Sequence, residues 1–337
     1  MATIEQVLAK VKRGRQTLPL HSRALHVFVG WAIVLVLATL TLNPALLFLA
    51  TTTVIYVLFA MSTNIMFGWT GMVTLGQAAF FGTGAYIVAL FADEALPPLV
   101  QLLFAALVAG ILGLLFALIS VRVVQVQFAM LTLVLGQVLW LLVYKIPALK
   151  GENGIPGLPR GTLLGVSLYD DKAQWAYTVL IVAICTYFLT RVSESSLGAA
   201  MNATRDDPVR AAATGINVRV VRIIALTMAG ALGGLAGALF AQQQGIVSPD
   251  VLTWILSGDV IVMCVIGGHH SFWGPAIGAV IFTVLTWFVF DVGETPNLYI
   301  GLVLVLLVLF WPEGLTGGLN ALRNRLGRRV ERDASTS

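Results

Sequence analysis

Residues 98–119 read PLVQLLFAALVAGILGLLFALI, and no side chain in this stretch is charged. A helix of about 20 apolar residues crosses the roughly 30 Å hydrocarbon layer of a bilayer, so the stretch predicts a membrane-spanning helix. Similar apolar runs recur along the chain. The candidate spans are 24–42, 46–66, 72–91, 98–119, 124–144, 173–190, 220–241, 252–266, 275–290 and 298–311. The sequence therefore predicts an all-α polytopic transmembrane helical bundle of about ten spans.

The composition supports this class. The 337 residues are 58% hydrophobic and 11% charged, whereas an ordinary soluble domain has roughly 45–50% apolar and about 25% charged residues. A free-standing soluble enzyme is excluded. Ten spans also leave too little chain for a folded aqueous domain, so the expected domain is one transmembrane unit over residues 24–311.

The positions of the basic residues predict the orientation. With the N-terminus inside the cell, most of the 20 lysines and arginines fall in inner segments, as the positive-inside rule requires. The outer loops hold only Lys145, Lys150, Lys172 and Arg160. Residues 1–23 are then a basic cytoplasmic arm and residues 312–337 a basic cytoplasmic tail. The net charge of +4 is explained by orientation and by the lipid bilayer, and it predicts no nucleic-acid partner.

Two connections are long. Residues 145–172 form an outer loop rich in glycine and proline, a composition typical of turns, which we expect to lie over the outer mouth. Residues 191–219 form an inner loop in which Asp207 can cap a helix, Pro208 suits its first position and Gly215 can end it. The sequence predicts a short helix on the cytoplasmic face.

A stretch rich in glycine and threonine, residues 68–84, is the most unusual part of the chain. It allows either close helix packing or a break that exposes backbone polar groups to a water-filled cavity. Thr74 and Gln77 are expected on one helical face, a pattern expected again in the fifth span. Uncharged amides and hydroxyls suit transient hydrogen bonding to a small polar solute. The predicted pathway residues are Thr70, Gly71, Thr74, Gly76, Gln77, Phe80, Gln127, Thr132, Gln137 and Asp259.

Few other side chains offer chemistry. Asp259 is the acid clearly within a predicted span, where a functional role and a helix-end role are both open. Cys185 and Cys264 lie in apolar runs and are expected to be core residues. The pair His269 and His270 is expected to be solvated or interfacial, and no metal site is predicted.

The chain contains no GxxxxGK[ST] phosphate loop. If transport is driven by ATP, hydrolysis therefore occurs in another subunit, which would also hold the ATP and magnesium. No catalytic residue and no cofactor are predicted for this chain. The inner-loop helix would couple the ATPase to the membrane through Arg205, Asp206, Asp207, Pro208, Arg210 and Gly215.

Several motifs together resemble a known family. They are Gly68-Trp69-Thr70-Gly71, the run from Leu75 to Tyr86, Phe128 to Leu133, Arg205-Asp206-Asp207-Pro208, Thr214 to Val218, Gly267-Gly268, Trp273-Gly274-Pro275 and Gly278-Ala279. Their order and spacing, from about residue 46 to 317, resemble the LivM-type permease subunit of bacterial branched-chain amino-acid ABC importers. The resemblance implies a type II importer architecture, a second LivH-like permease, two ABC ATPase subunits and a periplasmic or lipid-tethered solute-binding protein.

The resemblance implies that the chain forms half of a translocation pathway for leucine, isoleucine or valine in the bacterial inner membrane. Departures from the family pattern leave other solutes open, namely urea, short amides or aromatic carboxylates. They are Gln77 for a usual histidine, Trp69 and Gln127 for usual tyrosines, Gln137 for a usual acid, and His269-His270 in a usually small apolar turn. An ion-coupled secondary carrier or a passive small-solute channel is the alternative from a different class.

Overall fold

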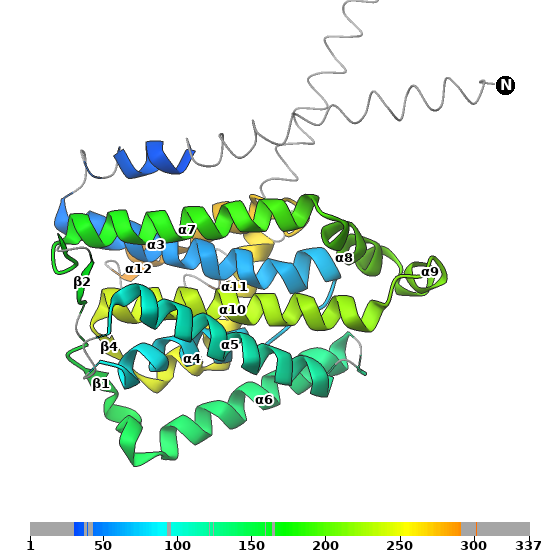
Figure 1. Ribbon diagram of the computed structural model, residues 1–337, viewed down its shortest axis with the longest axis horizontal. Coiled ribbons are helices and arrows are strands. Elements are labelled where there is room, and N and C mark those ends of the chain that lie inside the picture. The colour runs from blue at the N-terminus through cyan, green and yellow to red at the C-terminus, as the bar shows by residue number, and fades with distance from the viewer. Residues whose placement is uncertain are drawn as a thin grey trace, which may run out of the picture.

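A computed structural model describes residues 30–36, 39, 43–92, 96–120, 122–123, 125–158, 160–163, 166–290 and 301. The predicted N-terminal arm and C-terminal tail lie outside these residues. The first predicted span is described at residues 30–36 and 39, which are helical, and the last predicted span only at Gly301. The described chain is mostly helical (Figure 1).

The membrane helices follow the predicted apolar runs. Five helical segments of the described chain are long and apolar enough to cross a membrane, and three more are apolar but shorter. The long segments are α3 (Pro44–Asn64) with the π-helix Ile65–Trp69, α5 (Pro98–Ser120), α6 (Val126–Lys145), α7 (Asp171–Glu194) and α10 (Val218–Gln244). The shorter ones are α4 (Gln77–Leu90), α11 (Trp254–Gly267) and α12 (Gly274–Phe290). The chain is therefore a multi-pass membrane protein.

Helix α10 lies at the centre of the bundle and packs against α5, α4 and α3 (Figure 1). Glycines allow the close approach to α4. A methyl group added at Gly84 would overlap the carbonyl oxygen of Gly234, and one added at Gly237 would overlap that of Phe81. Small residues that let two backbones approach are typical of helix contacts in membranes. The close-packing interpretation of the glycine-rich stretch is thus confirmed for its C-terminal part.

The predicted span 72–91 is wrong at its start. Helix α4 begins only at Gln77, and residues 71–76 are not helical. Gly71 has a φ of +71°, a left-handed conformation that ends the preceding helix. The 14 residues of α4 extend about 21 Å, less than the thickness of a hydrocarbon layer. The glycine-rich stretch therefore contains a broken helix as well as a packed one.

The two ends of the bundle differ. At one end the strands β1 (Ile155–Pro156) and β4 (Ile246–Val247) pair antiparallel, as do β2 (Thr162–Leu163) and β3 (Val166–Ser167). Strands β1, β2 and β3 and two short 3-10 helices, Pro147–Leu149 and Gly151–Asn153, lie in the 145–172 loop, which confirms turns there. At the other end lie α8 (Ser196–Asp206) and α9 (Pro208–Ala213) (Figure 1).

Candidate functional site

Helix α9 has the local structure that its sequence predicts. The Asp207 carboxylate caps it, accepting hydrogen bonds from the backbone N–H of Val209 at 3.0 Å and of Arg210 at 3.1 Å. The same carboxylate forms an ion pair with Arg210 at 2.7 Å. Pro208 is the first helical residue, and Gly215 follows the helix with a φ of +89°. The cap and the terminal glycine fix a short, rigid helix on this end of the bundle.

The surface of α9 is open. The Val209 residue is 77% exposed and the Arg210 side chain 87% exposed, and Pro208 is exposed beside them. Val209 and Arg210 therefore project from the capped helix, one apolar and one basic. The described residues thus present a small protruding knob, defined here as residues 207–215.

Arg205, near the end of α8, connects this end of the bundle to the glycine-rich stretch. Its Nη1 donates a hydrogen bond to the carbonyl oxygen of Gly68 at 2.8 Å, and its Nε and Nη2 donate to Asp206 at 3.1 and 3.0 Å. Gly71 lies against the same side chain, because a methyl group there would stand 2.9 Å from Arg205 Cγ. Arg205, which the sequence predicts for coupling to the ATPase, is therefore in direct contact with Gly71, which it predicts for the translocation pathway.

The non-helical segment, residues 71–76, leads from this contact into α4. The Leu75 N–H donates to Thr132 Oγ1 of α6 at 3.2 Å, and the Ala78 N–H donates to Ser257 Oγ of α11 at 2.9 Å. Gly76 is pressed against the Thr132 carbonyl oxygen, which would lie 2.6 Å from an added methyl group. Side chains from two other helices thus satisfy the start of α4, where backbone N–H groups lack partners in the helix.

Gln77 and Phe80 are buried in the protein interior. Gln77 Nε2 donates to Ser62 Oγ and to the Ala229 carbonyl oxygen, both at 3.2 Å. Phe80 packs on Phe116 with ring centroids 5.2 Å apart. The predicted common helical face of Thr74 and Gln77 is wrong, because Thr74 precedes α4. In this conformation Gln77 joins α4 to α3 and α10, and Phe80 joins α4 to α5.

Thr70 and Thr74 are also buried. Thr70 Oγ1 donates to the Met66 carbonyl oxygen at 2.7 Å, within its own turn. Thr74 Oγ1 accepts a hydrogen bond from the Gly76 N–H at 3.3 Å. Both hydroxyls therefore hold the local backbone of the broken helix.

The polar residues of α6 do not share a face. Thr132 is buried, Gln127 is exposed and Gln137 is half-buried. A spacing of five residues rotates successive side chains by about 140° around a helix, which explains why the predicted repeat of the pattern is wrong. Thr132 joins the broken segment, and Gln127 and Gln137 lie on or beside the exposed side of the helix.

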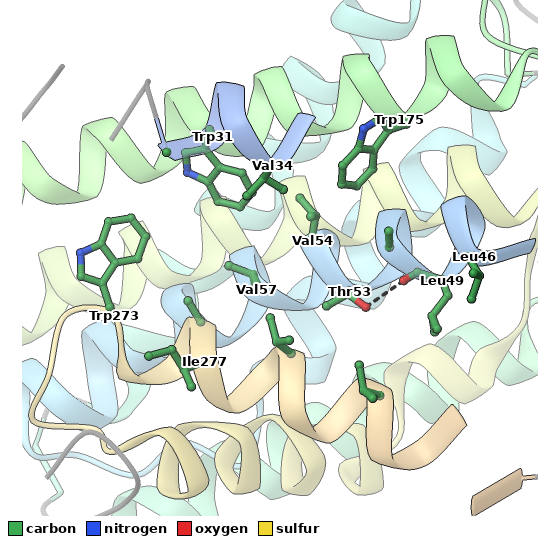
Figure 2. Close-up of a pocket in the computed structure, with 15 residues that line it drawn as sticks. Trp31, Val34, Leu46, Leu49, Thr53, Val54, Val57, Trp175, Trp273 and Ile277 are labelled. Carbon is green, nitrogen blue, oxygen red and sulfur yellow. Dashed lines mark hydrogen bonds between the residues drawn. The ribbon is translucent and has the colours of Figure 1, made fainter. Parts of the chain in front are cut away.

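Asp259 lies on α11, half-buried, and lines a cavity of about 1060 Å³ between α3, α11 and α12. A second cavity of about 600 Å³ lies between residues 30–34, α3 and α12, and Figure 2 shows Trp31, Trp175 and Trp273 around it. Among the described residues that line it, Thr53 alone carries a hydroxyl, which donates to the Leu49 carbonyl oxygen at 2.8 Å. The apolar walls of the second cavity offer little to a polar solute.

The histidines lie beside the Arg205 contact. His269 packs against Phe67 and His270 in tilted arrangements, with ring centroids 4.6 and 4.0 Å apart. Burial lowers the pKa of His269 below its ordinary value of 6.5, and His270 and Arg205 lower this pKa further. No group of three potential metal ligands occurs among the described residues.

The lowered pKa predicts a loss of stability in acid. The contribution of neutral His269 is fully present above pH 6.5 and is lost as the pH falls through the folded-state pKa, because the unfolded chain binds the proton more readily. We expect the thermal midpoint of the purified protein to fall between pH 7.5 and pH 5.5, and to fall less in His269→Gln. Equal pH profiles for the two proteins would show that His269 does not contribute.

Sequence reasoning missed several polar contacts. Ser62 and Ser257 each hold one end of a contact to α4, and Gln242 and Gln243 are buried at the end of α10. Gln243 Nε2 donates to the Phe48 carbonyl oxygen at 2.8 Å and to Thr52 Oγ1 at 2.9 Å. The sequence feature that indicates the Gln243 contact is the run of three glutamines at 242–244, directly after a predicted span.

The family model for the "branched-chain amino acid transport system / permease component" matches residues 45–311. The chain belongs to this family. It is an ABC-importer permease of the branched-chain amino acid transport family.

Individual relatives agree with this assignment. The chain is similar to the high-affinity branched-chain amino acid transport system permease protein LivM of Escherichia coli K12, with 29% identity over 292 residues, 79% of this chain and 69% of the relative. LivM of Salmonella typhimurium matches with the same identity and coverage. The autoinducer 2 import system permease protein LsrC of Escherichia coli O9:H4 is 28% identical over 200 residues, 53% of this chain and 54% of the relative.

No solved structure matches the chain. Within this permease family, LsrC is named for a solute other than a branched-chain amino acid, so membership alone leaves the solute of this permease open.

Proposed function

We propose that this chain forms half of the translocation pathway of an ABC importer for leucine, isoleucine and valine in the bacterial inner membrane. The similarity to two LivM proteins supports the solute class. A distinct LivH-like permease would form the other half, two ABC ATPase subunits would lie below, and a solute-binding protein would deliver solute from outside. The chain itself would hold no cofactor and would have ten spans with both termini in the cytoplasm.

One contact carries the proposal, the hydrogen bond from Arg205 to Gly68. The knob would dock in a groove of the ATPase, so that closure of the ATPase dimer moves α8. Arg205 would pass this movement to the broken helix at residues 68–76. Leu75 in this segment is bonded to α6, and Ala78, just after it in α4, is bonded to α11. The coupling segment thereby has a direct mechanical link to the membrane helices.

The exposed side of α6 is the proposed contact with the second permease. It carries apolar side chains that are half exposed or more, including Met130 and Val134, together with the exposed amide of Gln127. An unpaired amide facing lipid is costly. A hydrogen bond to a protein partner, or water in the pathway between two permeases, would satisfy the amide. This face is therefore better covered by the second subunit than by lipid.

Reconstitution tests the function. In proteoliposomes that contain this chain, the second permease, the ATPases and the binding protein, we expect leucine uptake that requires ATP and the binding protein. The chain reconstituted alone should give no flux. Flux without ATPase subunits would instead support an ion-coupled carrier or a channel, and uptake of urea, amides or aromatic carboxylates in place of leucine would change the solute.

Removal of the α9 cap is expected to uncouple the importer. Asp207→Ala deletes an acceptor of two backbone N–H groups, a loss of about 1 kcal/mol for a helix N-terminus, and Pro208→Gly loosens the same turn. We expect leucine uptake to fall several-fold while ATP hydrolysis persists and the membrane domain stays folded. Asp207→Asn keeps an acceptor and should retain most uptake. Wild-type coupling in both Asp207→Ala and Pro208→Gly would remove this role from the knob.

A further inference from the structure

The cavity beside Asp259 differs from its surroundings in its polar lining. Among the described residues it is lined by apolar side chains of α3, α11 and α12 together with six polar ones, Thr52, Tyr56, Gln244, Asp259, Thr283 and Thr286. Its volume of about 1060 Å³ is ample for a small solute with some water. Ala45, at the start of α3, and Gln244, at the end of α10, line one part of the cavity. This part therefore lies at the end of the bundle opposite the knob.

The hydroxyl groups of the three threonines in this cavity already donate to backbone carbonyl oxygens. Thr52 Oγ1 donates to the Phe48 carbonyl oxygen at 3.0 Å. Thr283 Oγ1 and Thr286 Oγ1 donate at 2.8 Å to carbonyl oxygens one turn earlier, those of Ala279 and Phe282. A hydroxyl group has one proton, so each of these oxygens can only accept a further hydrogen bond. The threonines therefore favour a ligand that donates hydrogen bonds.

Asp259 adds acceptors and charge. It is the charged residue on the described cavity wall, and no ion pair or hydrogen bond joins it to another described residue. An acid within a membrane helix is costly unless a cation or water pairs with it. A carboxylate on the same cavity wall as these threonine acceptors favours a cationic donor group and repels an anion.

We propose that this cavity is a binding site for the primary ammonium group of the transported solute, with Asp259 as its counter-ion and Thr283 and Thr286 as further acceptors. The inference rests on the proposed function and narrows it. An ammonium-bearing amino acid fits these walls, whereas an aromatic carboxylate without an amine does not. Asp259 would then select solutes that carry an amine.

Chemical labelling of the assembled importer tests the site. Val262→Cys places a thiol on the cavity wall without removing an assigned acceptor, and the two native cysteines, Cys185 and Cys264, are buried. We would measure its labelling by the neutral reagent methyl methanethiosulfonate, with the parent protein as the background. The probes are 3-methylbutylamine, which has the ammonium group only, and 4-methylpentanoate, which has the carboxylate only.

We expect 3-methylbutylamine to slow the labelling at least threefold and 4-methylpentanoate to leave it unchanged. Asp259→Asn should abolish the protection and Asp259→Glu should retain it, at unchanged thermal midpoints. The matched control Asp250→Asn removes an exposed acid outside the cavity and should keep the protection.

Four results would overturn the inference: equal protection by both probes, protection that survives Asp259→Asn, protection by sodium chloride but not by choline chloride or the amine, and a thiol that never reacts. The last would show that the cavity is closed to solution.

The uptake assay separates this site from the proposed function. ATP-driven leucine uptake without amine protection rejects only the cavity, and amine protection without leucine uptake rejects only the solute assignment.

Discussion

Gly84→Ala is expected to cost this permease most of its folded yield. The added methyl group would overlap the carbonyl oxygen of Gly234 and stand 2.7 Å from the Gly234 Cα atom. Both atoms belong to the backbone of α10, so no side-chain rotation can relieve the overlap, and the two helices must separate. Overpacking of a filled core costs about 1–3 kcal/mol, and we expect the upper end of that range here.

The measurement is the thermal midpoint of the detergent-solubilised protein, together with the amount recovered as a monodisperse species. Gly258→Ala is the matched control, because no atom lies within 4 Å of the methyl group it adds, and alanine favours a helix interior by about 1 kcal/mol over glycine. Its midpoint should stay level or rise. A Gly84→Ala protein with the wild-type midpoint would show that α4 and α10 are not packed backbone to backbone.

This contact also shows what the sequence could predict. Apolar runs locate helices because hydrocarbon requires long uncharged segments, and five described segments meet that requirement at the predicted positions. Glycines at 82 and 84 predict either close packing or a break, but the sequence does not name the partner. The contact between Gly84 and Gly234 joins positions far apart in the chain, and no local pattern specifies it.

The candidate site was predictable where it depends on local chemistry. Asp207, Pro208 and Gly215 form a capped helix because their side chains and backbone preferences act within one or two turns. The predicted common face of Thr74 and Gln77 is wrong because residues 71–76 are not helical and α4 begins only at Gln77. The link from Arg205 to Gly68 could not be predicted, since 137 residues separate the two partners.

Arg205→Ala is expected to have the largest effect on transport without loss of the fold. The variant deletes the hydrogen bond to the Gly68 carbonyl oxygen, and a hydrogen bond from a charged donor contributes about 1.5–3 kcal/mol. If that bond couples α8 to the broken helix, we expect leucine uptake to fall at least tenfold while the assembled importer still hydrolyses ATP. The readout is therefore the ratio of ATP hydrolysed to leucine imported, because a structural defect would lower both quantities together.

Two further variants separate the contact from the charge. Arg219→Ala removes an exposed arginine near the same end of the bundle and should leave the ratio unchanged. Asp206→Ala removes only an exposed ion-pair partner of Arg205, with a side chain 69% exposed, and should have a small effect because such pairs contribute little. An unchanged ratio in Arg205→Ala would mean that the knob drives the membrane helices by another route.

Gly71→Ala provides the decisive cross-check on the Arg205 contact. The variant forces an alanine into a φ of +71°, at a cost of about 1–2 kcal/mol, and presses its methyl group against Arg205 Cγ. Because both variants break the same junction, the double variant Arg205→Ala with Gly71→Ala should be no worse coupled than Arg205→Ala alone. Independent residues would instead give additive losses. Additive losses would mean that Gly71 acts only through the backbone of the broken helix. Non-additive losses would show that α8 moves this helix through the Arg205 side chain.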